Sequence, residues 1–317
     1  DKQYFTESKQ WHKAALEIRK RLTDKNPQAY EPDLAQSYHN LAILYFSTQH
    51  FDESEKMYKS AVDIYKRLVE TNPKIYESAL AMCYHNLADL YNDTQCFTES
   101  EQMYKAAVDI YKRLAETNPQ AYEPSLAQSY NNLANLYFAI QCFSESEKMH
   151  KAALEIRKRL AEANPQAYEP ALAQSYYNLA NSYFGAQRFD EVEKMHRAAM
   201  IIYKRLAEDN PQVYKSYLAV DYINIAYTSI LSKQFAQAEL YSIEALKVDS
   251  TKYFANTNLA LAYLLQGKYA DAEKIYIQYK SELKNDFLND FEEFAKAGII
   301  PTERQADVEK IKKILKE

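Results

Sequence analysis

The sequence predicts an all-α solenoid, and three observations support this prediction. Asn-Pro pairs recur every 46 residues, at 26–27, 72–73, 118–119, 164–165 and 210–211. Such a period is typical of stacked repeats rather than of separate globular domains. The 317 residues include only 3 glycines, which excludes Gly-rich phosphate loops and disfavours tight hairpins. Alanine, leucine, glutamate and lysine, all helix-favouring residues, dominate the composition.

Aligning the repeats divides the chain into units of two helices each. We expect a partial unit at 1–31, four units of 46 residues at 32–215, two of 34 residues at 216–283, and a tail at 284–317. The first helix carries Asn-Leu-Ala-x-x-Tyr, which places Leu, Ala and Tyr on one buried stripe. The second begins at an aromatic residue and ends at Asn-Pro, because the residue before proline is pushed out of the α region. Since 1–31 matches only a second helix, starting at Phe5, we expect a fragment whose partner helix lies upstream.

The tail at 284–317 is predicted to cap the array. Four apolar residues spaced by three or four between 283 and 294 form one helical stripe. Gly298 is a predicted C-cap, and Pro301 a predicted start of the last helix. Because a solenoid needs its last apolar face covered, we expect these helices to cover the apolar end of the wall, between Val220 and Leu265. The alternative is that this apolar end is an open binding pocket.

The two-helix unit resembles the tetratricopeptide repeat (TPR), whose signature places Leu-small-x-x-Tyr in the first helix. The match is closest in the 34-residue units, as at Leu259, Ala260 and Tyr263. The 46-residue units resemble the long-helix variety found in kinesin light chains, with Asn-Asn-Leu-Ala at 131–134 as the nearest match. They differ where Ser54, Ser100, Ser146 and Val192 replace the small alanine of the second helix. The resemblance implies a right-handed superhelix of antiparallel helix pairs, with the first helices on a concave wall.

The resemblance also implies which residues line the concave groove. The candidate peptide-binding residues are Asn40, Asn86, Asp89, Asp93, Asn131, Asn132, Asn135, Phe138, Tyr177, Asn178, Asn181, Phe184, Asn224 and Tyr227. One asparagine recurs in every unit, at 40, 86, 132, 178, 224 and 258. Because an amide both donates and accepts, such a row can bond the main chain of an extended peptide. The alternative is that each asparagine bonds within its own helix pair.

The charge of this wall restricts the ligand. No lysine or arginine occurs at 32–51, 78–97, 124–143 or 170–187. Related family members grip acidic C-terminal tails with basic residues on this wall, so we expect that such a tail is not the ligand. Asp89 and Asp93 are the only inward charges. They predict a ligand with one basic residue, unless both are simply solvated.

Several functional classes are disfavoured. A net charge of -5 and a pI near 5.8 provide no basic surface for nucleic acid or membranes. Three cysteines without CxxC spacing favour a reducing, cytoplasmic compartment. The histidines fall into repeat columns, whose neighbouring rows lie roughly 8–10 Å apart, too far to share a metal ion. We therefore expect no catalytic residue, metal or cofactor, and no enzyme.

These observations favour a non-catalytic scaffold that holds a peptide or partner protein in its concave groove. A regulatory or sensor arm of a larger signalling or enzymatic protein is the alternative. The sequence identifies neither the partner nor the oligomeric state.

Overall fold

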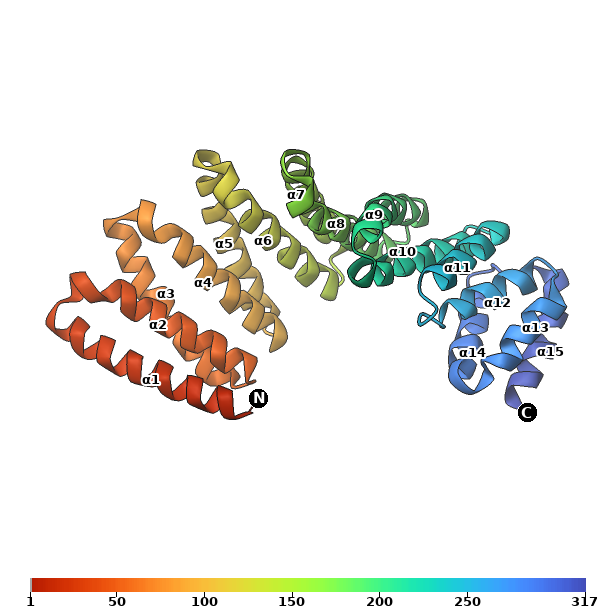
Figure 1. Cartoon of the computed structure of the whole chain (residues 1–317), viewed down its shortest axis with the longest axis horizontal. Helices are drawn as coiled ribbons and strands as arrows, with labels where there is room; N and C mark the ends of the chain where they lie inside the picture. Colours follow the sequence, from red (N-terminus) through yellow and green to blue (C-terminus); the bar gives the residue numbers. More distant parts are fainter. Residues whose placement is uncertain (1) are drawn as a thin grey trace. The chain divides into compact units, whose positions relative to one another are not determined.

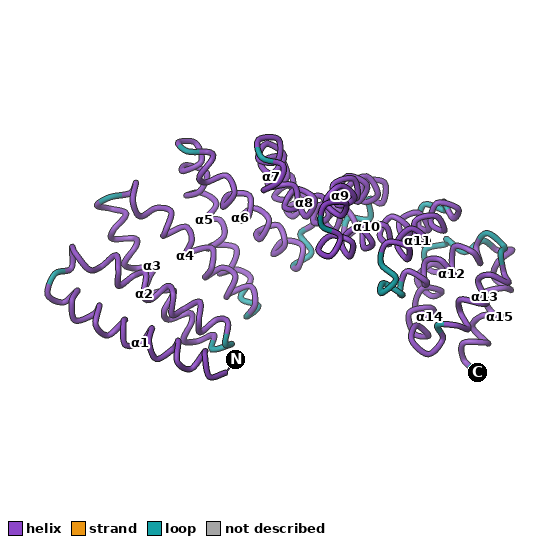
Figure 2. Tube along the Cα trace, in the orientation of Figure 1, coloured by secondary structure: helices purple, strands orange, loops and turns teal. Residues whose placement is uncertain are grey.

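The computed structural model describes residues 2–317, with side chains from residue 7 onwards. This described part is helical throughout and contains no strand (Figures 1 and 2), which confirms the predicted all-α solenoid. The side chain of Phe5 lies outside the described residues. The helices are α1 (Lys2–Lys25), α2 (Pro27–Ser47), α3 (Phe51–Thr71), α4 (Pro73–Asp93), α5 (Phe97–Thr117), α6 (Pro119–Ala139), α7 (Phe143–Ala163), α8 (Pro165–Gly185), α9 (Phe189–Asp209), α10 (Pro211–Leu231), α11 (Phe235–Val248), α12 (Ala255–Leu265), α13 (Tyr269–Gln278), α14 (Lys280–Lys296) and α15 (Gln305–Lys316).

The helices form two compact units, an N-terminal unit (Asp1–Ile156) and a C-terminal unit (Arg157–Glu317). Within each unit, helices that follow one another in sequence pack against one another. Helices α2, α4 and α6 also contact their next neighbours, so they form one layer, the first-helix wall of the N-terminal unit. Helices α8, α10 and α12 form the corresponding wall of the C-terminal unit, since Phe184 of α8 contacts Tyr227 of α10 and α10 contacts α12. The limits of the individual repeat units remain a prediction.

Asn-Pro both ends one helix and begins the next. Asn72 is the C-cap of α3 and the N-cap of α4, and Pro73 occupies the first turn of α4. At Asn118 the side chain accepts the backbone N–H of Ala121, which satisfies one of the free donors at the start of α6. Proline fits the first turn because its missing N–H would have no helical partner there. The Asn-Pro pairs therefore recur every 46 residues because each marks the end of one helix and the start of the next.

The turns from first to second helices share a left-handed residue. Their φ angles are positive at Gln49, Gln95, Gln141, Gln187, Lys233 and Gly267. At the second of these turns the N–H of Cys96 bonds the carbonyl of Tyr91 at 2.8 Å, the long bond of a Schellman motif. The sequence did not predict this geometry, because glutamine is not a typical left-handed residue.

The repeated Leu-Ala-x-x-Tyr stripe is buried as predicted, with Leu41, Ala42 and Tyr45 as its first copy. The second helix crosses close to the small alanine. The buried Ser54 hydroxyl donates to the carbonyl of Ala42 at 2.9 Å, and Ser100 repeats this bond to Ala88. A serine is therefore tolerated where the family has alanine, because its hydroxyl is satisfied by the facing helix.

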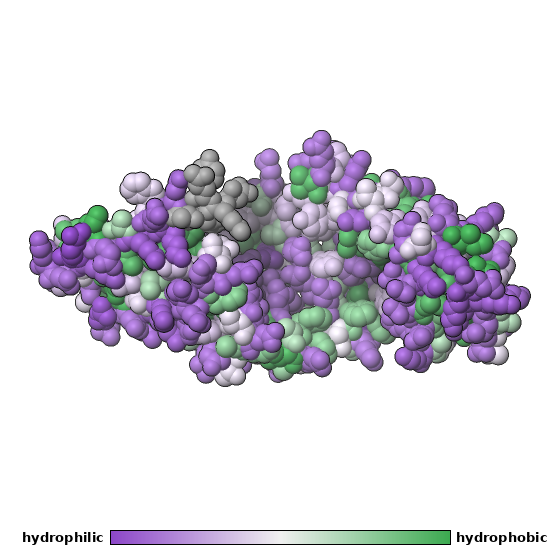
Figure 3. Space-filling view, turned by 90° about the horizontal axis from the view of Figure 1, so that it is seen from below, coloured by the Kyte–Doolittle hydropathy of each residue, from purple (hydrophilic) through white to green (hydrophobic). Residues whose placement is uncertain are grey.

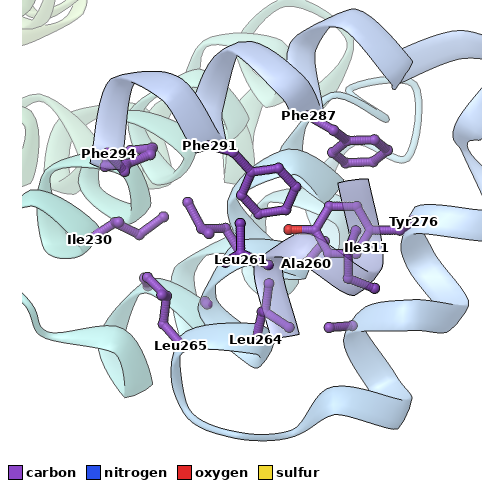
Figure 4. Packing of buried hydrophobic residues seen from close by; sticks show 14 of the residues in the cluster. Ile230, Ala260, Leu261, Leu264, Leu265, Tyr276, Phe287, Phe291, Phe294 and Ile311 are labelled. Atoms are coloured by element: carbon purple, nitrogen blue, oxygen red, sulfur yellow. The ribbon is translucent and has the colours of Figure 1, made fainter. Parts of the chain in front are cut away.

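The tail caps the last repeat, as predicted. Phe287, Phe291 and Phe294 of α14 pack on the apolar side chains of α12 and α13 (Figure 4). Gly298 has a φ of 66° and ends α14, and a 3-10 turn (Thr302–Arg304) follows Pro301 and leads into α15. Among the described residues, no helix is sufficiently long and apolar to cross a membrane.

Candidate functional site

In the N-terminal unit, the predicted asparagine row forms hydrogen bonds inside the wall. The amide nitrogen of Asn86 lies 3.3 Å from Nε2 of His39 in the preceding repeat. Asn132 repeats this contact with His85 at 3.2 Å and also donates to Asp89 Oδ1 at 3.1 Å. The row therefore joins consecutive repeats to each other.

The histidines in this network are neutral. Burial lowers the pKa of His39 to about 4. Since the Asn86 amide donates to Nε2, the ring proton lies on Nδ1, which is 3.0 Å from Cys83 Sγ. His85 has the same arrangement, with Nδ1 3.0 Å from Ser129 Oγ, and burial lowers its pKa while Asp89 partly offsets that effect.

The other N-terminal candidates are hydrogen-bonded, buried or exposed. Asp89 also accepts the hydroxyl of Tyr104, and burial together with Asp89 raises the pKa of Asp93. Three members of the asparagine row accept a hydrogen bond at Oδ1 from the side-chain amide of a glutamine one turn earlier. The pairs are Gln36–Asn40, Gln128–Asn132 and, in the C-terminal unit, Gln174–Asn178. Asn131 is buried, Asn135 is exposed, and the exposed Phe138 ring packs on Phe143.

The C-terminal unit differs, because two predicted asparagines keep their side-chain amides free of hydrogen bonds to any described residue. Asn181 and Asn224 are half-buried and line a cavity of about 250 Å³ together with Phe184, Tyr227 and His196. Asn224 belongs to the asparagine row. The residue that takes the place of its histidine partner in the preceding repeat is Tyr177, whose ring lies edge-on to His196 at 5.4 Å. Tyr177 therefore presents no imidazole nitrogen to the row.

Two further cavities lie along the same wall. One of about 690 Å³ is lined by the aromatic rings of Phe184, Phe189 and Tyr227, with Glu293 and Lys296 also on its lining. It shares Phe184 and Tyr227 with the smaller cavity, so the two cavities lie side by side at these rings. A third, of about 390 Å³, is lined by Gln174, Tyr177, Tyr203, Ser216, Tyr217 and Val220. Figure 3 shows apolar patches interrupting the hydrophilic surface of the molecule.

A buried His–Asp pair joins α9 to α10, a helix of this wall, and was not among the predicted site residues. His196 Nδ1 lies 3.0 Å from Asp221 Oδ1, and both residues are almost fully buried. Burial raises the pKa of Asp221, while the hydrogen bond from His196 lowers it. A signal was available, since Asp221 is the one carboxylate in a column that otherwise holds Ser37, Cys83, Ser129 and Ser175. Among the described residues, no group of three His, Cys, Asp or Glu side chains could hold a metal ion.

Stacked helix pairs with a cavity-lined first-helix wall define the class of helical-repeat scaffolds. Three family models described as tetratricopeptide repeat match residues 34–73 and 80–120, 125–205, and 257–289, more than half of the chain. The chain belongs to the tetratricopeptide repeat family, whose members serve as protein-interaction scaffolds. No curated protein matches the chain by sequence.

Solved structures with the same fold share little sequence with this chain. BtubC (BKLC) from P. vanneervenii is 22% identical, with a TM-score of 0.61 over 78% of this chain and 91% of that chain. The apo form of RapI is 14% identical, with a TM-score of 0.57 over 89% and 97%. Kinesin light chain nearly identical TPR-like repeats from Podosopora anserina are 17% identical, with a TM-score of 0.52 over 68% and 95%. The last agrees with the predicted resemblance to long-helix repeats. At these identities the likeness shows the fold alone.

Proposed function

We propose that the chain binds an extended segment of a partner protein along the first-helix wall of the C-terminal unit. One observation carries this proposal: Asn181 and Asn224 present half-buried amides that bond no side chain or backbone group of the described residues, beside cavities lined by aromatic rings. Both side chains keep some contact with solvent, so a ligand can replace the water that hydrates their amides. Two such amides that face one cavity are therefore suited to donors and acceptors supplied by a ligand.

The chemistry of this wall suits a polypeptide. An amide both donates and accepts, so Asn181 and Asn224 match the N–H and C=O groups of an extended main chain. Each such bond contributes about 0.5–1.5 kcal/mol net. The aromatic cavity beside Phe184 and Tyr227 removes an apolar side chain from water, at about 25 cal/mol per Å². Because the wall is formed before binding, the ordering cost falls on the ligand.

A titration with fluorescent random 12-residue peptide pools tests the proposal. We expect the Asn181→Ala plus Asn224→Ala variant to bind about tenfold more weakly than wild type, because two hydrogen bonds are lost. The matched control is Gln102→Ala plus Gln120→Ala, which removes two exposed amides of the N-terminal unit. Equal affinity of wild type and the Asn181/Asn224 variant would refute this site.

A further inference from the structure

Helix α14 presents a row of acidic side chains next to the aromatic cavity. Asp286, Asp290 and Glu293 are spaced by four and three residues, so they share one face of the helix. Glu293 lines the cavity of about 690 Å³ and accepts the hydroxyl of Tyr227. The Tyr227 ring in turn lies 5.4 Å from Phe294 and 6.0 Å from Phe184. Glu293 therefore places one end of the acidic row on the cavity of the proposed peptide site, and Asp290 lies one helical turn before it.

The acids of this row differ from those of the second helices, because they lack salt-bridge partners among the described residues. None of the three carboxylates forms an ion pair there, although Lys296 also lines the cavity. On the second helices, by contrast, acids are paired with lysines one turn later, as in Glu55–Lys59 and Glu101–Lys105. Acids without such pairs beside an apolar cavity point to a cation supplied from outside.

The carboxyl group of Asp290 is destabilised in its ionised form by burial and by its acidic neighbours. Its Oδ2 atom is buried without a hydrogen-bond partner. Burial, reinforced by the charges of Glu293 and Asp286, raises the pKa of its carboxyl group to about 7. An adjacent cation would favour the ionised carboxylate and offset the repulsion among the three acids.

We propose that α14 forms a charged wall of the peptide site, and that the partner segment carries an arginine or lysine close to a bulky apolar side chain. The apolar side chain enters the cavity between Phe184 and Tyr227, and the cation lies against Asp290 and Glu293. This assignment rests on the proposed function. An arginine fits best, because its guanidinium can donate to both carboxylates and stack on the Tyr227 ring.

Three pools of N-acetylated, C-amidated 12-residue peptides test this ligand class. Each pool has phenylalanine at position 5, and arginine, glutamine or glutamate at position 8, with the same neutral random residues elsewhere. We expect the arginine pool to bind about fivefold more tightly than the glutamine pool, and the glutamate pool to bind most weakly. The preference should shrink between 50 and 300 mM salt, because the charges are partly exposed to solvent.

The variant Asp290→Asn plus Glu293→Gln separates charge from shape. We expect it to bind the arginine and glutamine pools equally, because both substitutions keep the side-chain size and remove the negative charge. The amide oxygen introduced by Glu293→Gln can still accept the Tyr227 hydroxyl. The control Glu208→Gln plus Glu292→Gln removes two exposed acids that line neither cavity, and it should keep the preference.

The two proposals fail in different ways. Equal affinity of wild type for the three pools, with binding still dependent on Asn181 and Asn224, would overturn only the charged wall. An arginine preference that survives in the Asp290/Glu293 variant would overturn it as well. Absence of binding by all pools would overturn the proposed function itself.

Discussion

At the scale of single residues, one asparagine position has two environments. Asn132 bonds His85, Asp89 and Gln128, whereas the side chain of Asn224 bonds no described residue. The residue type is the same, and the neighbour in the preceding repeat decides its role. Where that neighbour is histidine, the amide joins repeats. Where it is tyrosine, as at Asn224, the amide remains available.

This difference predicts that the same substitution changes stability by different amounts at the two positions. Asn132→Ala should lower the free energy of unfolding by about 1–3 kcal/mol, because His85 and Asp89 lose a buried partner. Asn224→Ala should change it by less than about 0.5 kcal/mol. Urea unfolding followed by circular dichroism measures both. Equal losses in the two variants would contradict the two environments.

His39 predicts a pH dependence of stability. Its pKa is about 4 in the folded chain against 6.5 when unfolded, so the unfolded state binds more protons between these values. The stability that neutral His39 contributes is complete above pH 6.5 and is lost as the pH falls toward 4. The loss amounts to about 2 kcal/mol at pH 5.

The variant His39→Asn isolates this contribution, since Asn131 occupies the equivalent position two repeats later. We expect the urea midpoint of the variant to fall less than that of wild type between pH 7 and pH 5. Parallel decreases in the two proteins would show that His39 does not titrate as its burial implies.

At the scale of helices and turns, the left-handed glutamines predict that a substitution by glycine stabilises the chain at a turn and destabilises it inside a helix. Gln95 has a φ of 61°, a conformation that glycine adopts without strain. Gln95→Gly should therefore raise stability by about 0.5–1 kcal/mol. Gln102→Gly, at an exposed position inside α5, should lower it by about 1 kcal/mol. Thermal unfolding of the two variants compares them, and destabilisation by both would count against strain at this turn.

The sequence predicted much at this scale, and it named Asn181, Phe184, Asn224 and Tyr227, which line the cavity of about 250 Å³, as candidate groove residues. The Asn-Pro period located the helix ends, because proline and a capping asparagine act locally. The apolar stripe of 283–294 predicted the cap, because helical spacing alone defines a face. The cavity of about 690 Å³ could not be predicted, since it depends on Tyr227 meeting Glu293, which lies 66 residues away. The Asp221–His196 pair, 25 residues apart, is likewise tertiary.

At the scale of the whole molecule, a change along one column separates the two kinds of wall. The residue two positions before the signature leucine is His39, His85, Asn131, Tyr177 and then Ile223. Each repeat contacts mainly its neighbours, so this gradual change alters the wall locally without changing the fold. Along the asparagine row, bonds to a histidine of the preceding repeat therefore occur in the N-terminal unit. In the C-terminal unit Asn224 lies on a cavity beside aromatic rings, and Asn258 donates to the carbonyl of Ile223.

The most direct test of this account compares two double variants in one peptide-pool titration by fluorescence anisotropy. Asn181→Ala plus Asn224→Ala should lose about tenfold in affinity while retaining the wild-type urea midpoint. Asn86→Ala plus Asn132→Ala should lose stability while the remaining folded protein keeps its affinity. The opposite result, in which the second pair abolishes binding and the first has no effect, would contradict the assignment of the binding surface to the C-terminal unit.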